Sequence, residues 1–201
     1  MPALAGEPMV YPSNLFDDDV TPRRDAEDAV TDRTWRVAHT KPRQEKALAR
    51  HLHSTGVSFF LPLCRKVIRR NRHRQLSWNP VFPGYLFFQA DEHERVEALR
   101  SNRIASLLDV YDPYELVADL HRVYRLISSD LPLFPEQRLR PGAPVRITSG
   151  PLKGLDGTIE RHKSASRFVV AVSFIQQAVS AEIDACEIEP ITDATPSESS
   201  E

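Results

Sequence analysis

The segment Trp78–Gln89, WNPVFPGYLFFQ, constrains the fold more than any other stretch of this chain. It places two prolines and a glycine directly before a run of aromatic and aliphatic residues, which predicts a turn followed by a central strand buried on both faces. In such a strand Tyr85 and Phe87 point to one face, and Leu86 and Phe88 point to the other. The alternation is the same whichever face is the core, so both assignments stay open at this point.

Charge divides the chain into a basic body and two acidic ends. Residues 1–32 carry a net charge of −6 and residues 192–201 one of −3, so the total of −2 leaves +7 on residues 33–191. Both ends are rich in Pro, Ser, Asp and Glu and lack periodic apolar residues, as is typical of disorder. We therefore expect a disordered acidic tail over residues 1–33 and a second disordered tail over 192–201.

Several classes of protein are disfavoured by what the sequence lacks. No run reaches the about 18 apolar residues of a membrane span, and no basic region precedes an apolar one at the N-terminus, so we expect a cytoplasmic protein without a membrane partner. Cys64 and Cys186 are too far apart for a metal-ligand motif, and His51 and His53 point to different faces of a helix. No P-loop, nucleophile elbow or paired carboxylates are present, so we expect no metal, no cofactor and no enzymatic activity.

The basic body begins with a mixed domain, an α+β fold over residues 34–128. Hydrophobic period, helix caps and turn residues define its elements. Strands are expected over residues 34–40, 57–63, 84–90 and 104–111, with a hairpin over 64–80. Helices are expected over residues 42–56, 91–102 and 112–129. Val96 and Leu99 should face inward from their helix, and Asp112 should cap the last helix in a capping box with Glu115.

The pattern of apolar and turn-forming residues changes after this domain. Residues 129–142 contain three prolines and no period, which predicts a linker over residues 129–139. Residues 140–191 read as short strands separated by turn signals, which is typical of a small barrel.

Two motifs now carry a family resemblance. Residues 144–159, PVRITSGPLKGLDGTI, resemble a KOW motif. The sequence FPGYLFF, after the strand and helix WRVAHTKPRQEKALARHL, resembles the N-terminal domain of the NusG family of transcription elongation factors. The resemblance implies an NGN-type α/β sandwich followed by an SH3-like five-stranded KOW β-barrel, in a monomeric, non-enzymatic regulator of RNA polymerase.

The resemblance also implies a docking surface for the polymerase clamp. Its residues would be His39, Phe82, Pro83, Tyr85 and Phe87, which places Tyr85 and Phe87 on an exposed face. Aromatic side chains suit such a role because they bury a large area with little loss of side-chain entropy.

Basic residues fall into two groups, both expected to bind DNA. Lys41, Arg43, His51 and Arg103 match positions that lie near the non-template strand in the specialised RfaH-like branch of the family, although a merely solvated basic face explains them equally well. Arginines also crowd the expected hairpin tip, where mutual repulsion favours an anionic partner such as upstream DNA. These tip residues are Arg69, Arg70, Arg72 and Arg74.

Three further expectations concern specialisation and partners. The segment from Ser58 to Phe87 resembles RfaH-like antiterminators that act on selected operons, although their polar His-Thr-Thr loop is not recognisable here. In the C-terminal domain, Phe174 and Ile175 match the loop that docks a ribosomal protein or termination factor, with a generic surface loop as the alternative. A KOW-containing ribosomal or translation-associated RNA-binding protein is the alternative function.

Overall fold

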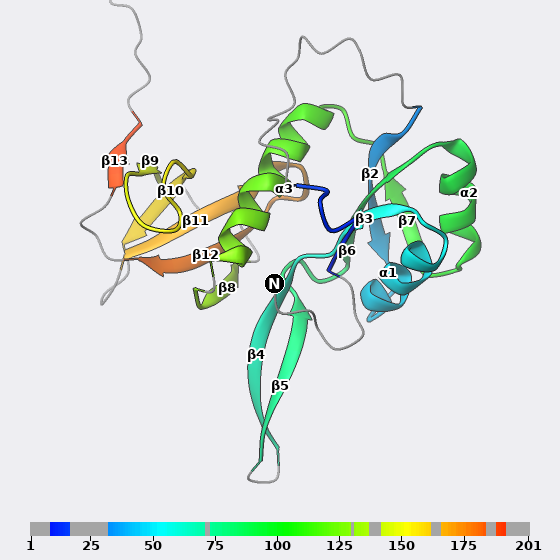
Figure 1. Ribbon diagram of the computed structural model, residues 1–201, viewed down its shortest axis with the longest axis horizontal. Helices are drawn as coiled ribbons and strands as arrows, with labels where there is room; N and C mark the ends of the chain where they lie inside the picture. Colours follow the sequence, from blue (N-terminus) through cyan, green and yellow to red (C-terminus); the bar gives the residue numbers. More distant parts are fainter. Residues whose placement is uncertain are drawn as a thin grey trace, which may run out of the picture.

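The computed structural model describes residues 9–16, 32–70, 73–129, 131–136, 142–161, 166–183 and 188–191, with the side chains of 66–70, 73–76 and 161 left out of the description. These residues form a five-stranded sheet, a six-stranded sheet and a projecting two-stranded hairpin (Figure 1).

The first sheet has the predicted strand at its centre. Its order is β1-β3-β6-β2-β7, and all its pairs are antiparallel. The strands are β1 (Val10–Tyr11), β3 (Ser58–Phe60), β6 (Tyr85–Ala90), β2 (Thr34–Thr40) and β7 (Ile104–Leu108). Phe87 is opposite Val37 on β2 and Phe60 on β3, so these three residues share one face of the sheet.

Two helices cover the opposite face of this sheet. They are α1 (Glu45–Ser54) and α2 (Glu92–Arg100). Leu86 and Phe88 are buried there with Leu48 and Leu52 of α1. Helix α1 begins three residues later than predicted, because Arg43 has a left-handed φ of 61° that interrupts the helical path.

The predicted inward side of α2 is wrong. Val96 and Leu99 are 37% and 40% exposed, and Ala98 is buried instead. The small Ala98 side chain allows α2 to approach its neighbours closely. Asp91 and Glu94 fix the start of α2 with a reciprocal capping box.

Helix α3 (Pro113–Ser128) covers the face that carries Phe87. The predicted N-cap is confirmed, since Asp112 Oδ1 accepts a hydrogen bond from the Glu115 N–H at 3.0 Å and Pro113 occupies the first turn. The buried residues of α3 form a stripe at helical spacing, as expected for a helix packed on a core. They are Leu116, Asp119, Leu120, Val123 and Leu126.

The second sheet is antiparallel and has the order β13-β9-β10-β11-β12-β8. Its strands are β8 (Leu133–Glu136), β9 (Ala143–Ile147), β10 (Asp156–Arg161), β11 (Ser166–Val172), β12 (Gln177–Ile183) and β13 (Ile188–Pro190). Strand β8 lies in the predicted linker, which is therefore partly wrong. The Arg167 guanidinium lies 4.5 Å from the centre of the Phe134 ring, and Ser180 Oγ donates to Glu136 Oε1 at 2.9 Å, so side-chain contacts hold β8 at this edge.

The hairpin predicted between the early strands is confirmed. Strands β4 (Leu63–Arg70) and β5 (His73–Pro80) pair along their whole length. They project away from both sheets (Figure 1).

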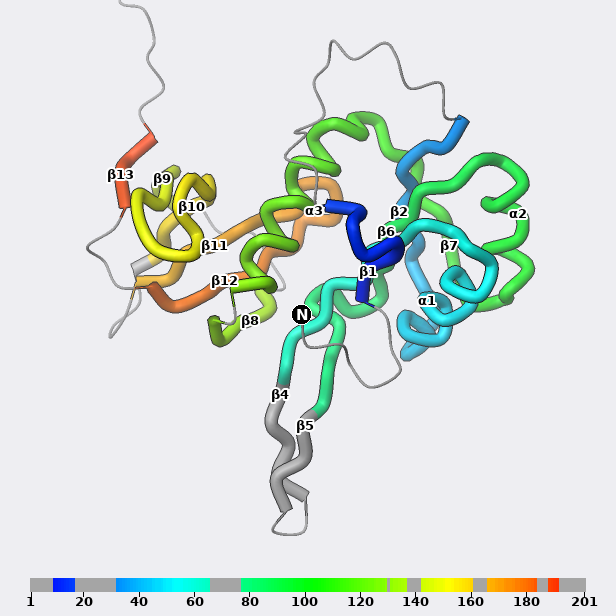
Figure 2. Tube along the Cα trace, viewed as in Figure 1, coloured from blue at the N-terminus to red at the C-terminus, as the bar shows by residue number. Residues whose placement is uncertain are grey.

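The N-terminal tail is partly inside the fold, which corrects the prediction that all of residues 1–33 lie outside it. Residues 9–16 lie against the first sheet (Figure 2), where β1 pairs with β3, and the Phe16 side chain is buried. Apolar residues within the acidic tail, Val10, Tyr11, Leu15 and Phe16, explain this difference.

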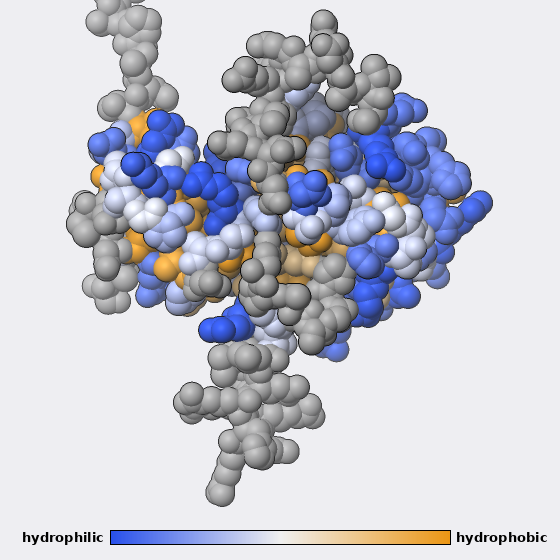
Figure 3. All heavy atoms as spheres, viewed as in Figure 1, coloured by the Kyte–Doolittle hydropathy of each residue, from blue (hydrophilic) through white to orange (hydrophobic). Residues whose placement is uncertain are grey.

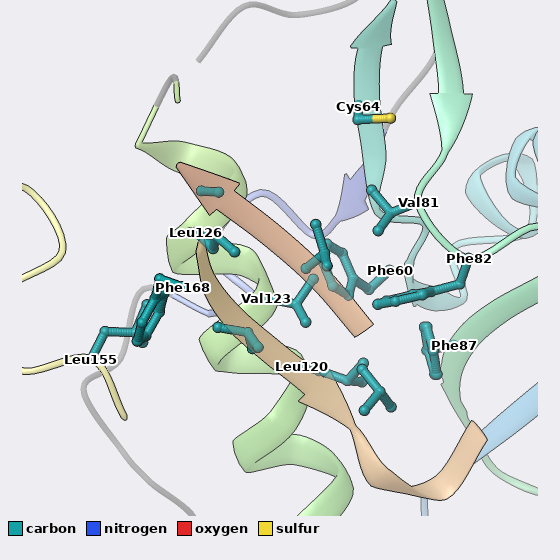
Figure 4. Close-up of a cluster of buried hydrophobic side chains, with 14 of the residues drawn as sticks. Phe60, Cys64, Val81, Phe82, Phe87, Leu120, Val123, Leu126, Leu155 and Phe168 are labelled. Carbon is teal, nitrogen blue, oxygen red and sulfur yellow. The ribbon is translucent and has the colours of Figure 1, made fainter. Parts of the chain in front are cut away.

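Helix α3 also joins the two sheets. It packs against β11 and against the short 3-10 helix η1 (Ser173–Ile175). The Asp119 carboxylate accepts a hydrogen bond from the Ser173 N–H at 2.8 Å and pairs with Arg122, and Arg125 Nη2 donates to the Lys153 carbonyl at 2.7 Å. In Figure 4, Leu120 and Val123 lie between a group containing Phe82 and Phe87 and the side chains of Leu155 and Phe168.

The buried Asp119 predicts a pH dependence of stability. Burial raises the pKa of the Asp119 carboxyl, although Ser173 and Arg122 act in the opposite direction. A raised pKa in the folded protein stabilises the fold below the ordinary aspartate pKa, and this contribution is lost as the pH rises through the raised value.

Asp119→Asn keeps an acceptor for the Ser173 N–H but cannot titrate. We therefore expect its free energy of unfolding, relative to the native chain, to increase as the pH rises through this window in urea titrations. If the difference in free energy of unfolding between Asp119→Asn and the native chain did not change with pH, the raised pKa of Asp119 would be contradicted.

Candidate functional site

The sequence FPGY forms a β-turn that sets the geometry of the site. The Tyr85 N–H donates to the Phe82 carbonyl at 3.1 Å, Pro83 takes the second position, and Gly84 takes the third with φ of 86°. Proline followed by a left-handed glycine is the pattern of a type II turn. The turn directs Phe82 into the core and starts β6 at Tyr85.

This turn is attached to β2 and to the start of α1. The Gly84 N–H donates to Glu45 Oε1 at 2.8 Å, and the Gly84 carbonyl accepts from the Thr40 N–H at 2.8 Å. A Cβ placed on Gly84 would lie 3.5 Å from the His39 imidazole. The turn and His39 therefore form one small rigid surface.

Three of the five predicted polymerase-binding residues reach this surface. His39 and Pro83 are exposed, and Tyr85 is half-buried. The His39 and Tyr85 rings lie 5.2 Å apart between centroids. An imidazole, a proline and a phenol thus lie together at the end of β2 and the start of β6.

The other two predicted residues, Phe82 and Phe87, are fully buried. Their rings meet edge to face at 6.2 Å, and Figure 4 shows them beside Val81 and Phe60. The predicted alternation is right, because Phe87 does point away from Leu86 and Phe88. The prediction that Phe87 is exposed is wrong, because α3 covers that face.

The residues predicted to bind a partner through the second sheet lie in the same cluster. Ile175 is buried and Phe174 half-buried in η1, and both pack into the cluster that contains Phe82 and Phe87. Residues from both predicted partner surfaces therefore contribute to one buried cluster.

The basic residues at the end of β2 are organised by hydrogen bonds. Lys41 Nζ donates to Asn102 Oδ1 at 2.6 Å, the Lys41 N–H donates to the Arg103 carbonyl at 2.8 Å, and Arg103 Nη1 donates to Gln44 Oε1 at 2.7 Å. Arg43 is exposed in the same loop. The structure thus brings Lys41 and Arg103 together, although they are far apart in sequence.

His51 is not part of this loop cluster. It is half-buried on α1, where its Nε2 lies 3.3 Å from the Glu97 carbonyl of α2. This contact gives His51 a role in packing α1 against α2.

The predicted arginine tip falls at the far end of the hairpin. Arg69 on β4 is directly opposite Arg74 on β5, and Arg70 is opposite His73. Arg72 lies outside the described residues.

The part of the chain that the structure describes holds no group of three or more His, Cys, Asp and Glu side chains suited to a metal ion. Nor does any of its helices have the length and apolar character needed to cross a membrane. The Cys64 side chain is buried, and Cys186 lies outside the described residues.

Sequence reasoning missed residues that the structure makes important. Asp119 and Arg125 contact the second sheet, and Phe16 fills the face under α3. A charged residue on the apolar stripe of a helix was the available signal for Asp119. The apolar residues in the acidic tail were the signal for Phe16.

Comparison with known proteins decides the family. The family model described as transcription termination factor nusG matches residues 33–133, about half of the chain. The chain belongs to the NusG family. The matched region contains the FPGY turn, the basic loop cluster, the hairpin and α1 to α3.

Other comparisons add little to the NusG-family assignment. No curated protein matches the chain. Among solved structures, the crystal structure of the MjSpt4:Spt5 complex in conformation B aligns with 79% of this chain and 97% of its own, at 12% identity and a TM-score of 0.25. A likeness at that score does not extend the assignment. The NusG model ends before β9, so the KOW assignment of residues 140–191 stays a prediction.

The turn geometry predicts the effect of a glycine substitution. Gly84→Ala should lower the free energy of unfolding by about 1–2 kcal/mol, because alanine disfavours positive φ. The matched control is Gly56→Ala, at a φ of 74° and with no atom within 4 Å of an added Cβ, so it shares the backbone cost without the His39 contact. Chemical denaturation measures the free energy of unfolding of each variant relative to the native chain. An unchanged stability of Gly84→Ala would contradict the type II turn.

Proposed function

We propose that this NusG-family chain is a transcription elongation factor that binds RNA polymerase across its cleft through the clamp. The observation that carries the proposal is the family match over residues 33–133, which includes the FPGY turn and the surface formed by His39, Pro83 and Tyr85. This surface supplies two ring systems on a rigid support, as suits an interface anchor.

Full engagement of the clamp requires a rearrangement. Phe82 and Phe87 belong to the proposed docking surface, and both are buried beneath α3 and η1. His39, Pro83 and Tyr85 would make the first contact, and Phe82 and Phe87 would follow once α3 moves. The same movement would free Phe174 and Ile175 for a ribosomal protein or termination factor.

Contact with DNA would accompany binding to polymerase. The loop with Lys41, Arg43 and Arg103 would lie toward the non-template strand, and the hairpin tip toward upstream duplex. Lys and Arg contacts to phosphate add affinity that falls with salt and does not depend on base sequence. His51 contributes least to this proposal, since it already contacts α2.

The proposed outcome is processive transcription and antitermination of selected operons by an RfaH-like member of the family. The resemblance of residues 58–87 to that branch supports this specialisation. No catalytic step is proposed, because the action follows from binding alone.

Polymerase binding is tested by truncating the exposed rings. The double variant His39→Ala, Tyr85→Ala should bind purified RNA polymerase at least about tenfold more weakly, since truncation of even one hot-spot residue costs about 2 kcal/mol or more and about 1.4 kcal/mol is tenfold. Tyr111→Ala, which removes a 93% exposed ring elsewhere, should bind normally. Normal binding by a folded double variant would refute the proposed surface, and failure of the native chain to bind would refute the function.

The hairpin tip is tested by the salt dependence of DNA binding. The triple variant Arg69→Gln, Arg70→Gln, Arg74→Gln should reduce the slope of log K against log salt by about 2–3, because each lost phosphate contact removes about 0.9. Arg100→Gln on α2, which removes an exposed charge that pairs with Glu97, should leave the slope unchanged. An unchanged slope for the triple variant would exclude the tip as a DNA contact.

A further inference from the structure

Residues 9–16 form a short strap across the edge of the first sheet. Strand β1 pairs with β3, and the Leu61 N–H donates to the Met9 carbonyl at 2.7 Å. Tyr11 lies on the α1 side, where its ring is 4.9 Å from His53 and 6.3 Å from Phe59. Backbone hydrogen bonds to β3 and the contacts of the Tyr11 ring thus attach the strap to the edge of the sheet.

Phe16, at the other end of the strap, lies on the α3 side of the sheet. Its ring centroid is 5.0 Å from that of Phe60 on β3 and 6.4 Å from that of Trp35 on β2. On α3, Tyr124 is 5.0 Å away and His121 6.2 Å away. A single buried side chain therefore contacts two strands and the helix that covers them.

This position couples the strap to the covered face. Phe16 belongs to the same buried cluster as Phe87 and as Leu120 and Val123 of α3. The opposite side of α3 is held by Asp119 and Arg125 through Ser173 and Lys153. Helix α3 is thus fixed on one side by the second sheet and on the other by Phe16.

The attachment of the strap is short enough to open locally. Strand β1 has only two residues at a sheet edge, and such elements open at a lower free energy than central strands.

We propose that residues 9–16 are a releasable strap, which locks α3 over the sheet through Phe16 and so controls access to Phe82 and Phe87. The part that concerns polymerase rests on the proposed function. When Phe16 leaves, α3 loses its aromatic support on the sheet side, and the covered face opens more often. The strap is thus an intramolecular competitor of the partner that binds this face.

The first test is hydrogen exchange of the full chain with Phe16→Ala. Exchange should become at least about tenfold faster at the Leu61 amide and along α3, which corresponds to about 1.4 kcal/mol of local opening, while the amides of β6 keep their rates. Phe16→Leu, which retains most of the volume, should show a smaller increase, and Tyr111→Ala should show none. An equal acceleration at all amides, or none, would overturn the strap as a separately releasing element.

The second test measures binding of the same full-length variants to purified RNA polymerase. Phe16→Ala should bind several-fold more tightly than the native chain. Equal or weaker binding by the variant would overturn control by the strap while leaving polymerase binding intact. Local release without binding by any variant, the native chain included, would support the strap and refute the proposed function instead.

Discussion

The burial of α3 between two sheets is the interaction on which the rest of this structure depends. One side of the helix covers Val37, Phe60 and Phe87, and the other meets β11 and η1. The space-filling view shows hydrophobic residues along the middle of the molecule and over the second sheet, while the right-hand edge is hydrophilic (Figure 3). One helix therefore contributes to a single core shared by both sheets, and a change in its position alters the packing of both.

Asp119 and Phe16 are complementary parts of this arrangement. The buried Asp119 carboxylate accepts a hydrogen bond from the Ser173 N–H of η1, and the Phe16 ring packs between α3 and the first sheet. A buried polar contact fixes a specific geometry, whereas an apolar contact supplies non-directional stabilisation. Asp119 therefore fixes the position of α3 relative to η1, and Phe16 stabilises the packing of α3 on the first sheet.

Much of the first domain could be predicted from sequence, because local signals agree there. The FPGY turn needs proline and glycine at adjacent positions, Asp112 and Pro113 start a helix, and alternation separates Phe87 from Phe88. The inward side of α2 and strand β8 could not be predicted. Ala98 is buried because α2 packs against α1 and β6, and β8 forms because it pairs with the edge of β12. Both features depend on contacts between segments that are distant in sequence.

The turn, the central strand, the basic hairpin and the family membership all follow from the amino-acid sequence. Which aromatic residues of the candidate site reach solvent depends instead on packing between segments that are distant in the chain. Periodicity assigns Tyr85 and Phe87 to the same face, but it does not say what lies on that face. Phe87 is covered because α3, η1 and Phe16, all distant in sequence, converge on it, and long-range packing decides exposure.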